Sequence, residues 1–151
     1  RIGFDGVAHA YQIANHVRDI YADDITFEVT SGEKLAAFLE SELATAVADR
    51  PREKPTGGHR RSAGADPGLT AVNAAFALAL LDRHDIVADH RLVDLAHAAQ
   101  TDAPVMDIER FRRRFVDLEP MPEDREILRA LVDLFEAYFE TRNGAADKRS
   151  E

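Results

Sequence analysis

The sequence of 151 residues contains no cysteine. Disulfide bonds, thiolate-bound zinc, iron–sulfur clusters and a cysteine nucleophile are therefore excluded. Long apolar runs are also missing. The apolar stretch at residues 69–81 is too short to span a bilayer, and Arg1 is not followed by the apolar segment of a signal peptide. We therefore expect a cytoplasmic protein that makes no contact with a membrane.

Positive charge is scarce as well. Lys and Arg together number 19 against 28 Asp and Glu, which gives a formal net charge of −9. This balance disfavours non-specific binding to nucleic acid and to anionic membranes. Hydrophobic residues at 45% and charged residues at 31% are typical of a soluble globular protein. The length is that of one domain or of two very small ones.

The sequence lacks two common catalytic motifs. No Gly-x-Ser-x-Gly elbow is present, so a hydrolase serine of that type is excluded. Gly57-Gly58 is followed by His59-Arg60-Arg61 rather than by Lys-Ser or Lys-Thr, so it is not a phosphate-binding loop. We therefore predict a non-enzymatic protein without a cofactor.

Residues 50–68 divide the chain, because they hold three prolines, four glycines and no apolar side chain larger than alanine. This composition predicts a long, flexible, basic linker. The linker is expected to separate a small α/β or α+β subdomain at residues 1–49 from a helical subdomain at residues 69–143, with a frayed tail at 144–151. The predicted fold class is mainly α, with one or two short strands near the N-terminus.

The two predicted strands lie on either side of the first predicted helix. Residues 7–21 carry apolar side chains at helical spacing, and Asp23 and Asp24 are expected to end that helix. Residues 25–29 alternate apolar and polar side chains, which predicts a strand with one buried face. A shorter strand is predicted around residues 2–4.

A second helix is predicted for residues 32–49. It is expected to begin with a capping box, in which Thr30 is the N-cap and Glu33 reaches back to it. Its spacing predicts a core face made of Leu35, Phe38, Leu39, Leu43, Ala46 and Val47.

After the linker the chain is predicted to be helical to its end. Residues 69–81 are apolar on nearly all sides, which predicts a buried helix. Asp89 and Asp107 are the expected N-caps of the next two helices. The last helix is expected to begin after Pro122 and to end before Gly144.

Histidines and aspartates gather between residues 84 and 97 and suggest a metal site. His90, Asp94 and His97 share one face of a helix at about 100° per residue. The leucines and alanines of the same helix lie on the opposite face, so we favour a solvated polar face. His84-Asp85 is the adjacent pair that helical metal-dependent hydrolases use, and a hydrolase centred on His84, Asp85 and His90 is an alternative.

A second alternative is a helix-turn-helix DNA-binding regulator at residues 92–116. Arg110, Arg113 and Arg114 would face the phosphates, with Arg60 and Arg61 of the linker adding charge. The acidic side chains at the end that would enter the groove argue against it, so nucleic acid is the less favoured partner.

The function we favour is a regulatory or protein-interaction domain that acts through homodimerisation or a partner protein. The helix at 69–81 and the apolar stripe of the last helix, residues 127–139, offer more apolar surface than a few short helices easily cover. A twofold interface is the usual outcome. The residues predicted to form it are Phe76, Leu80, Leu131, Phe135, Tyr138 and Phe139.

Overall fold

The computed structural model describes residues 4–29, 31–49 and 66–147. In these ranges it contains six α-helices and no strand. The prediction of a mainly helical fold is therefore confirmed. The helices are α1 (Phe4–Val29), α2 (Gly32–Ala48), α3 (Pro67–Arg83), α4 (His90–Asp102), α5 (Ile108–Val116) and α6 (Asp124–Asp147).

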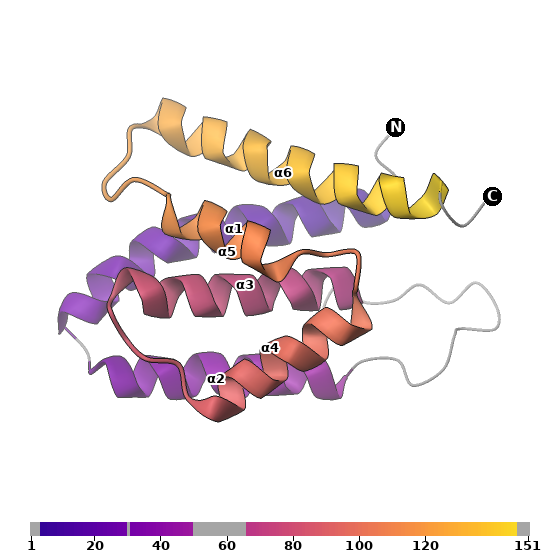
Figure 1. Ribbon diagram of the computed structural model, residues 1–151. Helices are drawn as coiled ribbons and strands as arrows, with labels where there is room; N and C mark the ends of the chain where they lie inside the picture. Colours follow the sequence, from indigo (N-terminus) through magenta and orange to yellow (C-terminus); the bar gives the residue numbers. More distant parts are fainter. Residues whose placement is uncertain (1–3, 30, 50–65, 148–151) are drawn as a thin grey trace.

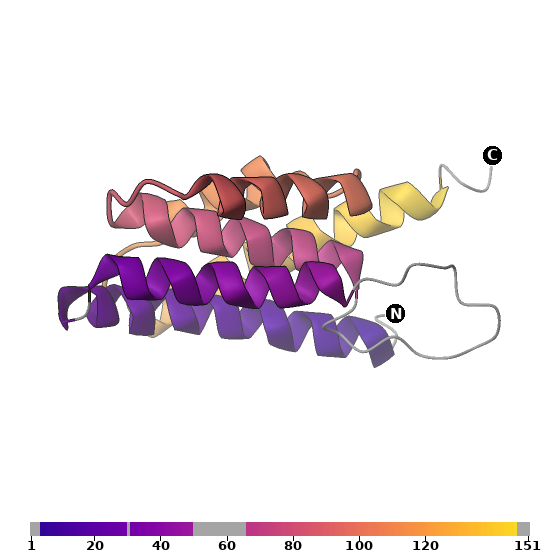
Figure 2. The same ribbon diagram turned by 90° about the horizontal axis from the view of Figure 1, so that it is seen from below.

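Helix α3 lies at the centre of the molecule. It packs against α1, α2, α4 and α5, while α6 packs on α1 at the upper side of the view in Figure 1. The view from below in Figure 2 shows α2 beside α1, with α3 and then α4 stacked above them. Buried side chains from all six helices form one hydrophobic core. The segments before and after residues 50–65 therefore contribute to the same interior.

The composition of α3 explains its central position. Eleven of its residues are buried, and five of these are alanines, so neighbouring helices can approach the α3 backbone closely from several directions. The sequence predicted a buried helix here and suggested that a second subunit would be needed to enclose it. That second inference is wrong, because the other helices of the same chain enclose α3.

The strand predicted at residues 25–29 is wrong. Helix α1 continues through Asp23 and Asp24 to Val29. The reason is tertiary: Asp24 binds Arg83 and His84, and the ring of Phe27 stacks on His84 with the ring centroids 4.0 Å apart. At helical spacing Asp24 and Phe27 lie on the same side of α1, so these contacts hold the segment in the helix. Residues 2 and 3 of the other predicted strand lie outside the described residues, and Phe4 is helical.

The helix ends show which local signals are reliable. Asp89 and Asp107 are the N-caps of α4 and α5, as predicted, and each accepts a backbone N–H with its side chain. The N-cap of α2 is Ser31 rather than Thr30. Helix α6 runs past Gly144 to Asp147, so the predicted end of this helix is wrong, and residues 148–151 of the predicted tail lie outside the described residues.

The boundary of the predicted linker also changes. Residues 50–65 lie outside the described part of the chain, but Asp66 is the N-cap of α3, and Pro67 and Gly68 form its first turn. The Asp66 side chain accepts the backbone N–H groups of Gly68 and Leu69 at 2.9 and 3.1 Å. Within the described residues, no helix is both long enough and apolar enough to cross a membrane.

Candidate functional site

Helices α1 and α6 run antiparallel, and a polar cluster joins them at one end. His9 near the start of α1 has its Nδ1 atom 2.9 Å from the Tyr138 hydroxyl and 2.8 Å from Arg142 Nη1, both near the end of α6. Arg142 also donates to the Asp66 carboxylate at 3.3 Å. At the other end of the pair, Tyr21 lies beside the first turns of α6. Helix α6 thus lies along α1, and the end of α6 is close to the start of α1 (Figure 1).

Helix α6 carries two apolar stripes. The first faces the core and contains Leu134 and Tyr138, both at most 1% exposed. The second follows the first by one residue, so it is rotated by about 100° around the helix. Its members recur at intervals of four, three and four residues, the spacing by which one helix packs along another. They are Leu128, Val132, Phe135 and Phe139.

The second stripe lies on the side of α6 that borders α1. It is next to Arg142 around the helix, and Arg142 reaches His9 of α1. Val7 and Tyr11 are exposed on α1 at the level of the last turns of α6. Val7, Tyr11, Leu128 and Val132 are 61%, 68%, 62% and 50% exposed, while Phe135 and Phe139 are half-buried against the core. We call these six residues the α1/α6 surface.

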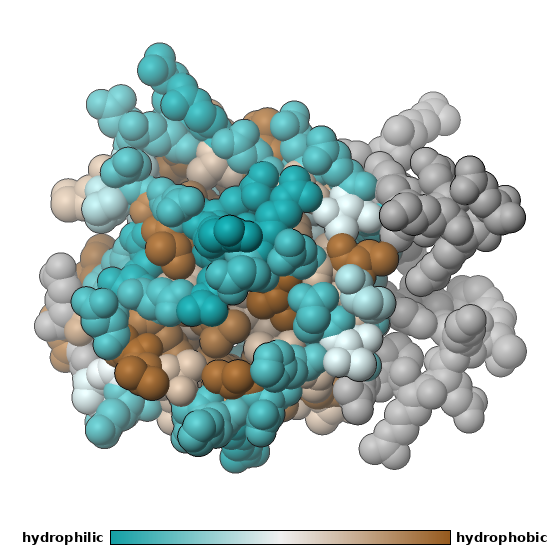
Figure 3. Space-filling view, viewed as in Figure 1, coloured by the Kyte–Doolittle hydropathy of each residue, from teal (hydrophilic) through white to brown (hydrophobic). Residues whose placement is uncertain are grey.

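The α1/α6 surface differs in composition from the face that α4 and α5 form. The face shown in Figure 3 lies over α4, α5 and α6, and it is mostly hydrophilic with scattered apolar side chains. On the α1/α6 surface, four exposed apolar side chains lie on two neighbouring helices, with the half-buried Phe135 and Phe139 on the same stripe of α6, and large exposed apolar surface is a feature of interaction sites.

Only part of the predicted interface is available for contact. Phe76, Leu80 and Tyr138 are 6%, 0% and 0% exposed, so their own chain covers them and they cannot meet a partner in this fold. Leu131, Phe135 and Phe139 are half-buried. Sequence reasoning missed four exposed positions, Val7, Tyr11, Leu128 and Val132. For Leu128 and Val132 the sequence did contain an indication, because the apolar stripe of α6 is wider than a single face packed on the core requires.

The five candidate metal ligands do not come together. His84 Nε2 lies 2.8 Å from Asp24 Oδ1, and its ring stacks on Phe27. Asp85, His90, Asp94 and His97 are exposed. Among the residues that the structure describes, no group of three or more His, Asp or Glu side chains could hold a metal ion.

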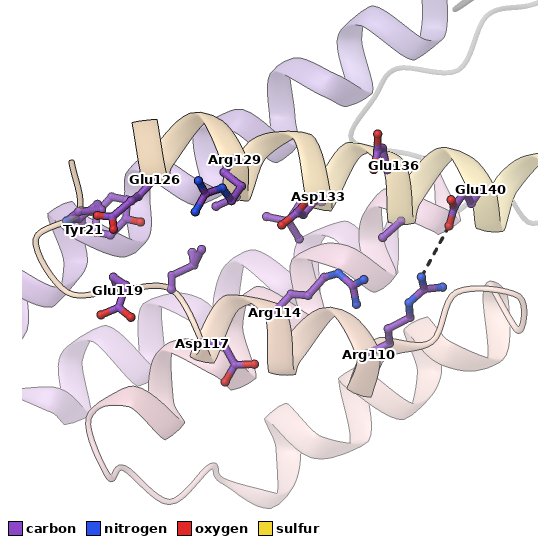
Figure 4. Close-up of a pocket in the computed structure, with 15 residues that line it drawn as sticks. Tyr21, Arg110, Arg114, Asp117, Glu119, Glu126, Arg129, Asp133, Glu136 and Glu140 are labelled. Carbon is purple, nitrogen blue, oxygen red and sulfur yellow. Dashed lines mark ion pairs between the residues drawn. The ribbon is translucent and has the colours of Figure 1, made fainter. Parts of the chain in front are cut away.

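Arg110 and Arg114 of α5 line a groove of about 690 Å³ between α5 and α6. Figure 4 shows Arg110 and Arg114 extending from α5 toward α6, with Arg110 paired to Glu140. The groove also contains Asp133, and Arg113 points elsewhere and donates to the Glu109 carbonyl. The three arginines of the groove, Arg110, Arg114 and Arg129, are outnumbered by acidic side chains, so the groove is not the basic surface that a phosphate backbone requires. Arg60 and Arg61 lie outside the described residues.

A second groove of about 530 Å³ lies between α1, α2 and α3. At its base His16 Nε2 lies 2.6 Å from Asn73 Oδ1, and the His16 ring stacks on Phe76 with the centroids 4.5 Å apart. Burial lowers the pKa of His16, although the hydrogen bond with Asn73 and the charge of Asp19 act in the opposite direction. His16 is therefore a neutral part of the interior. Phe38, predicted to be in the core, lines this groove and is exposed.

The fold and surface together define an all-α bundle with an apolar face on two outer helices. Residues 3–140 match the model of a protein family that is described only as a family of unknown function, DUF5781. Because the match covers most of the sequence, the chain belongs to this family. Comparison with curated proteins and with solved structures gives no match.

Proposed function

We propose that this chain is a non-enzymatic interaction domain that acts by self-association through the α1/α6 surface. The observation that carries the proposal is the exposure of Val7, Tyr11, Leu128 and Val132 on two helices that pack side by side. Leaving such side chains in water lowers the stability of an isolated copy relative to one whose surface is covered. A second copy, which carries the same apolar face, is the simplest partner of matching chemistry.

The expected affinity is modest. Complete burial of an aliphatic or aromatic side chain contributes about 1.5–3 kcal/mol, so burying the exposed part of each of these four contributes roughly 1 kcal/mol. Two copies bring eight such side chains, and the half-buried Phe135 and Phe139 of each copy add four more, so the gross gain is roughly 12 kcal/mol. The loss of translational and rotational freedom costs about 4 kcal/mol or more, which leaves about 8 kcal/mol, so we expect dissociation in the micromolar range.

Sedimentation velocity from about 1 to 200 μM covers that range of dissociation constants. We expect the average mass to rise with concentration, and we expect Leu128→Glu to keep the protein monomeric, because each interface would then bury two carboxylates. Val87→Glu is the matched control: Val87 is 92% exposed in the segment between α3 and α4, away from the α1/α6 surface. A native protein that stays monomeric throughout, or a Leu128→Glu variant that associates like the native chain, would contradict the proposal.

A further inference from the structure

The charges beside the outer stripe of α6 indicate how two copies meet. Arg129 and Glu136 both lie on the flank of the stripe that faces away from α1, and both are exposed. They are seven residues apart, about 10 Å along the helix, so they are too distant to pair within one copy. No ion pair to either side chain is present among the described residues.

From this arrangement we infer that a second copy docks with its α6 antiparallel to the first α6, around a twofold axis near Asp133. This inference rests on the proposed self-association and adds its geometry. With the axis perpendicular to both helices, Val132 of one copy lies next to Phe135 of the other, and Leu128 lies next to Phe139. The four apolar positions of each stripe are then matched along their whole length.

The same symmetry pairs the charges. A twofold axis perpendicular to two antiparallel helices brings each flank of the stripe against the same flank of the other copy. Arg129 then faces Glu136 of the second copy, and Glu136 faces Arg129. Two opposite-charge pairs therefore lie along the edge of the contact between the two α6 helices. A parallel arrangement would instead place this flank against the inner flank of the second copy, which carries Leu131 and Tyr138. Charge complementarity therefore favours the antiparallel pairing.

The α1 side chains fit the same arrangement. Tyr11 and Val7 lie at the level of Phe139 on one copy. In the antiparallel pair, Leu128 of the second copy lies at this level. The α1 residues therefore extend the apolar contact at both ends of the paired α6 helices. The α5–α6 groove stays on the charged flank, outside the apolar contact (Figure 4).

Charge exchange tests the pairing directly. Arg129→Glu places four carboxylates on the flank where two pairs stood, and Glu136→Arg places four guanidinium groups there. Each single variant is expected to weaken dimerisation about tenfold at low salt. The double variant Arg129→Glu/Glu136→Arg restores both pairs with the charges exchanged, so its dissociation constant is expected to return to within about threefold of the native value.

Two exposed positions away from α6 provide charge-matched controls. Arg113→Glu on α5 and Glu42→Arg on α2 change the net charge by the same amounts, and each is expected to alter the dissociation constant less than twofold. Circular dichroism verifies that every variant keeps its helices. If the dimer depends on Leu128 but the double variant is as weak as the two single changes combined, the antiparallel arrangement is wrong and the proposed function stands. If no dimer forms at any concentration, both proposals fail.

Discussion

Asp24 of α1 accepts a hydrogen bond from Arg83 at the end of α3, with Arg83 Nε 3.1 Å from Asp24 Oδ1, across 59 positions of sequence. A second guanidinium nitrogen of Arg83 pairs with Asp24 Oδ2, and Arg83 also donates to the carbonyls of Val116 and Leu118 at 2.9 and 2.6 Å. One side chain thus joins α1, α3 and the end of α5. Asp24 Oδ2 and the two carbonyls depend on Arg83 for these hydrogen bonds, whereas Asp24 Oδ1 is also bound by His84.

We expect Arg83→Met to destabilise the fold by about 3 kcal/mol, because it leaves the Asp24 carboxylate and two carbonyls without that donor. Urea unfolding followed by circular dichroism measures the change. Arg113→Met on the exposed side of α5 is the control, and we expect a loss below about 0.5 kcal/mol there. Equal losses in the two variants would show that the Arg83 contacts contribute nothing specific.

The same cluster predicts an acid-dependent loss of stability. Burial alone would raise the pKa of Asp24, but the hydrogen bonds from Arg83 and His84, together with their charge, hold the pKa below its ordinary value. An acid with a lower pKa in the folded state stabilises the fold above its unfolded pKa, about 3.9. That contribution disappears as the pH falls through the folded pKa. We expect Asp24→Asn to flatten this part of the curve of unfolding free energy against pH, and an unchanged slope would contradict the assignment.

His16 is expected to change the free energy of unfolding at a pH closer to neutral than Asp24 does. Its pKa is lowered in the folded state, mainly by burial. Unfolding therefore exposes a group that binds a proton more readily, and the free energy of unfolding is expected to fall as the pH drops below about 6.5. His16→Gln is expected to remove this part of the pH dependence, even though loss of the stacking on Phe76 lowers its stability overall. Nuclear magnetic resonance titration of the His16 ring provides an independent measurement, and an ordinary pKa would refute the prediction.

Sequence patterns predicted the elements whose determinants are local. The caps Asp89 and Asp107 and the apolar spacing of residues 108–116 depend on neighbours within one or two turns. The prediction of a strand at residues 25–29 was wrong because the determinant there is not local. Five alternating residues fit a strand and the end of a helix equally well, and the partner that decides, His84, is distant in sequence. Contacts of that kind leave no trace in local periodicity.

The candidate site was predicted in part for a related reason. The apolar character of residues 69–81 indicates that this helix is surrounded, but it does not say whether the surrounding helices belong to the same chain. The sequence therefore predicts an interface at Phe76 and Leu80, where the structure has other helices of the same chain. On α6 the apolar residues cover enough of the helix surface for two stripes. Only the packing of α6 on α1 shows which stripe stays exposed to solvent.

Tyr138 should report on the cluster at the end of α1 and α6. Burial raises its pKa to about 12, with a further contribution from Asp66. A raised pKa means that the folded state holds the phenol proton more firmly, so this contribution to stability is present below the unfolded pKa of about 10 and is lost as the pH rises toward 12. Ultraviolet titration of the tyrosines is expected to show a last step near that value that Tyr138→Phe removes. A titration unchanged by Tyr138→Phe would contradict the burial of this hydroxyl.

The alanines of α3 should not tolerate enlargement. Ala79 is 0% exposed, so Ala79→Leu has to displace a neighbouring helix, and we expect a loss of about 2 kcal/mol. Ala37→Leu, at an exposed position of α2, is the matched control and should change the stability by less than about 0.5 kcal/mol. A tolerated leucine at position 79 would mean that the helices around α3 are more loosely packed than their burial indicates.

The enclosure of α3 also constrains how this chain can be divided. Its walls come from the stretch before residue 50 and from the stretch after residue 89, so neither stretch alone can keep the central helix dry. If the chain is divided within residues 50–65, the portion with α1 and α2 and the portion with α3 to α6 should each be poorly folded and prone to aggregation. Mixing the two portions should recover the native helical content. The unit that folds, and that natural selection can duplicate or fuse, therefore contains all six helices.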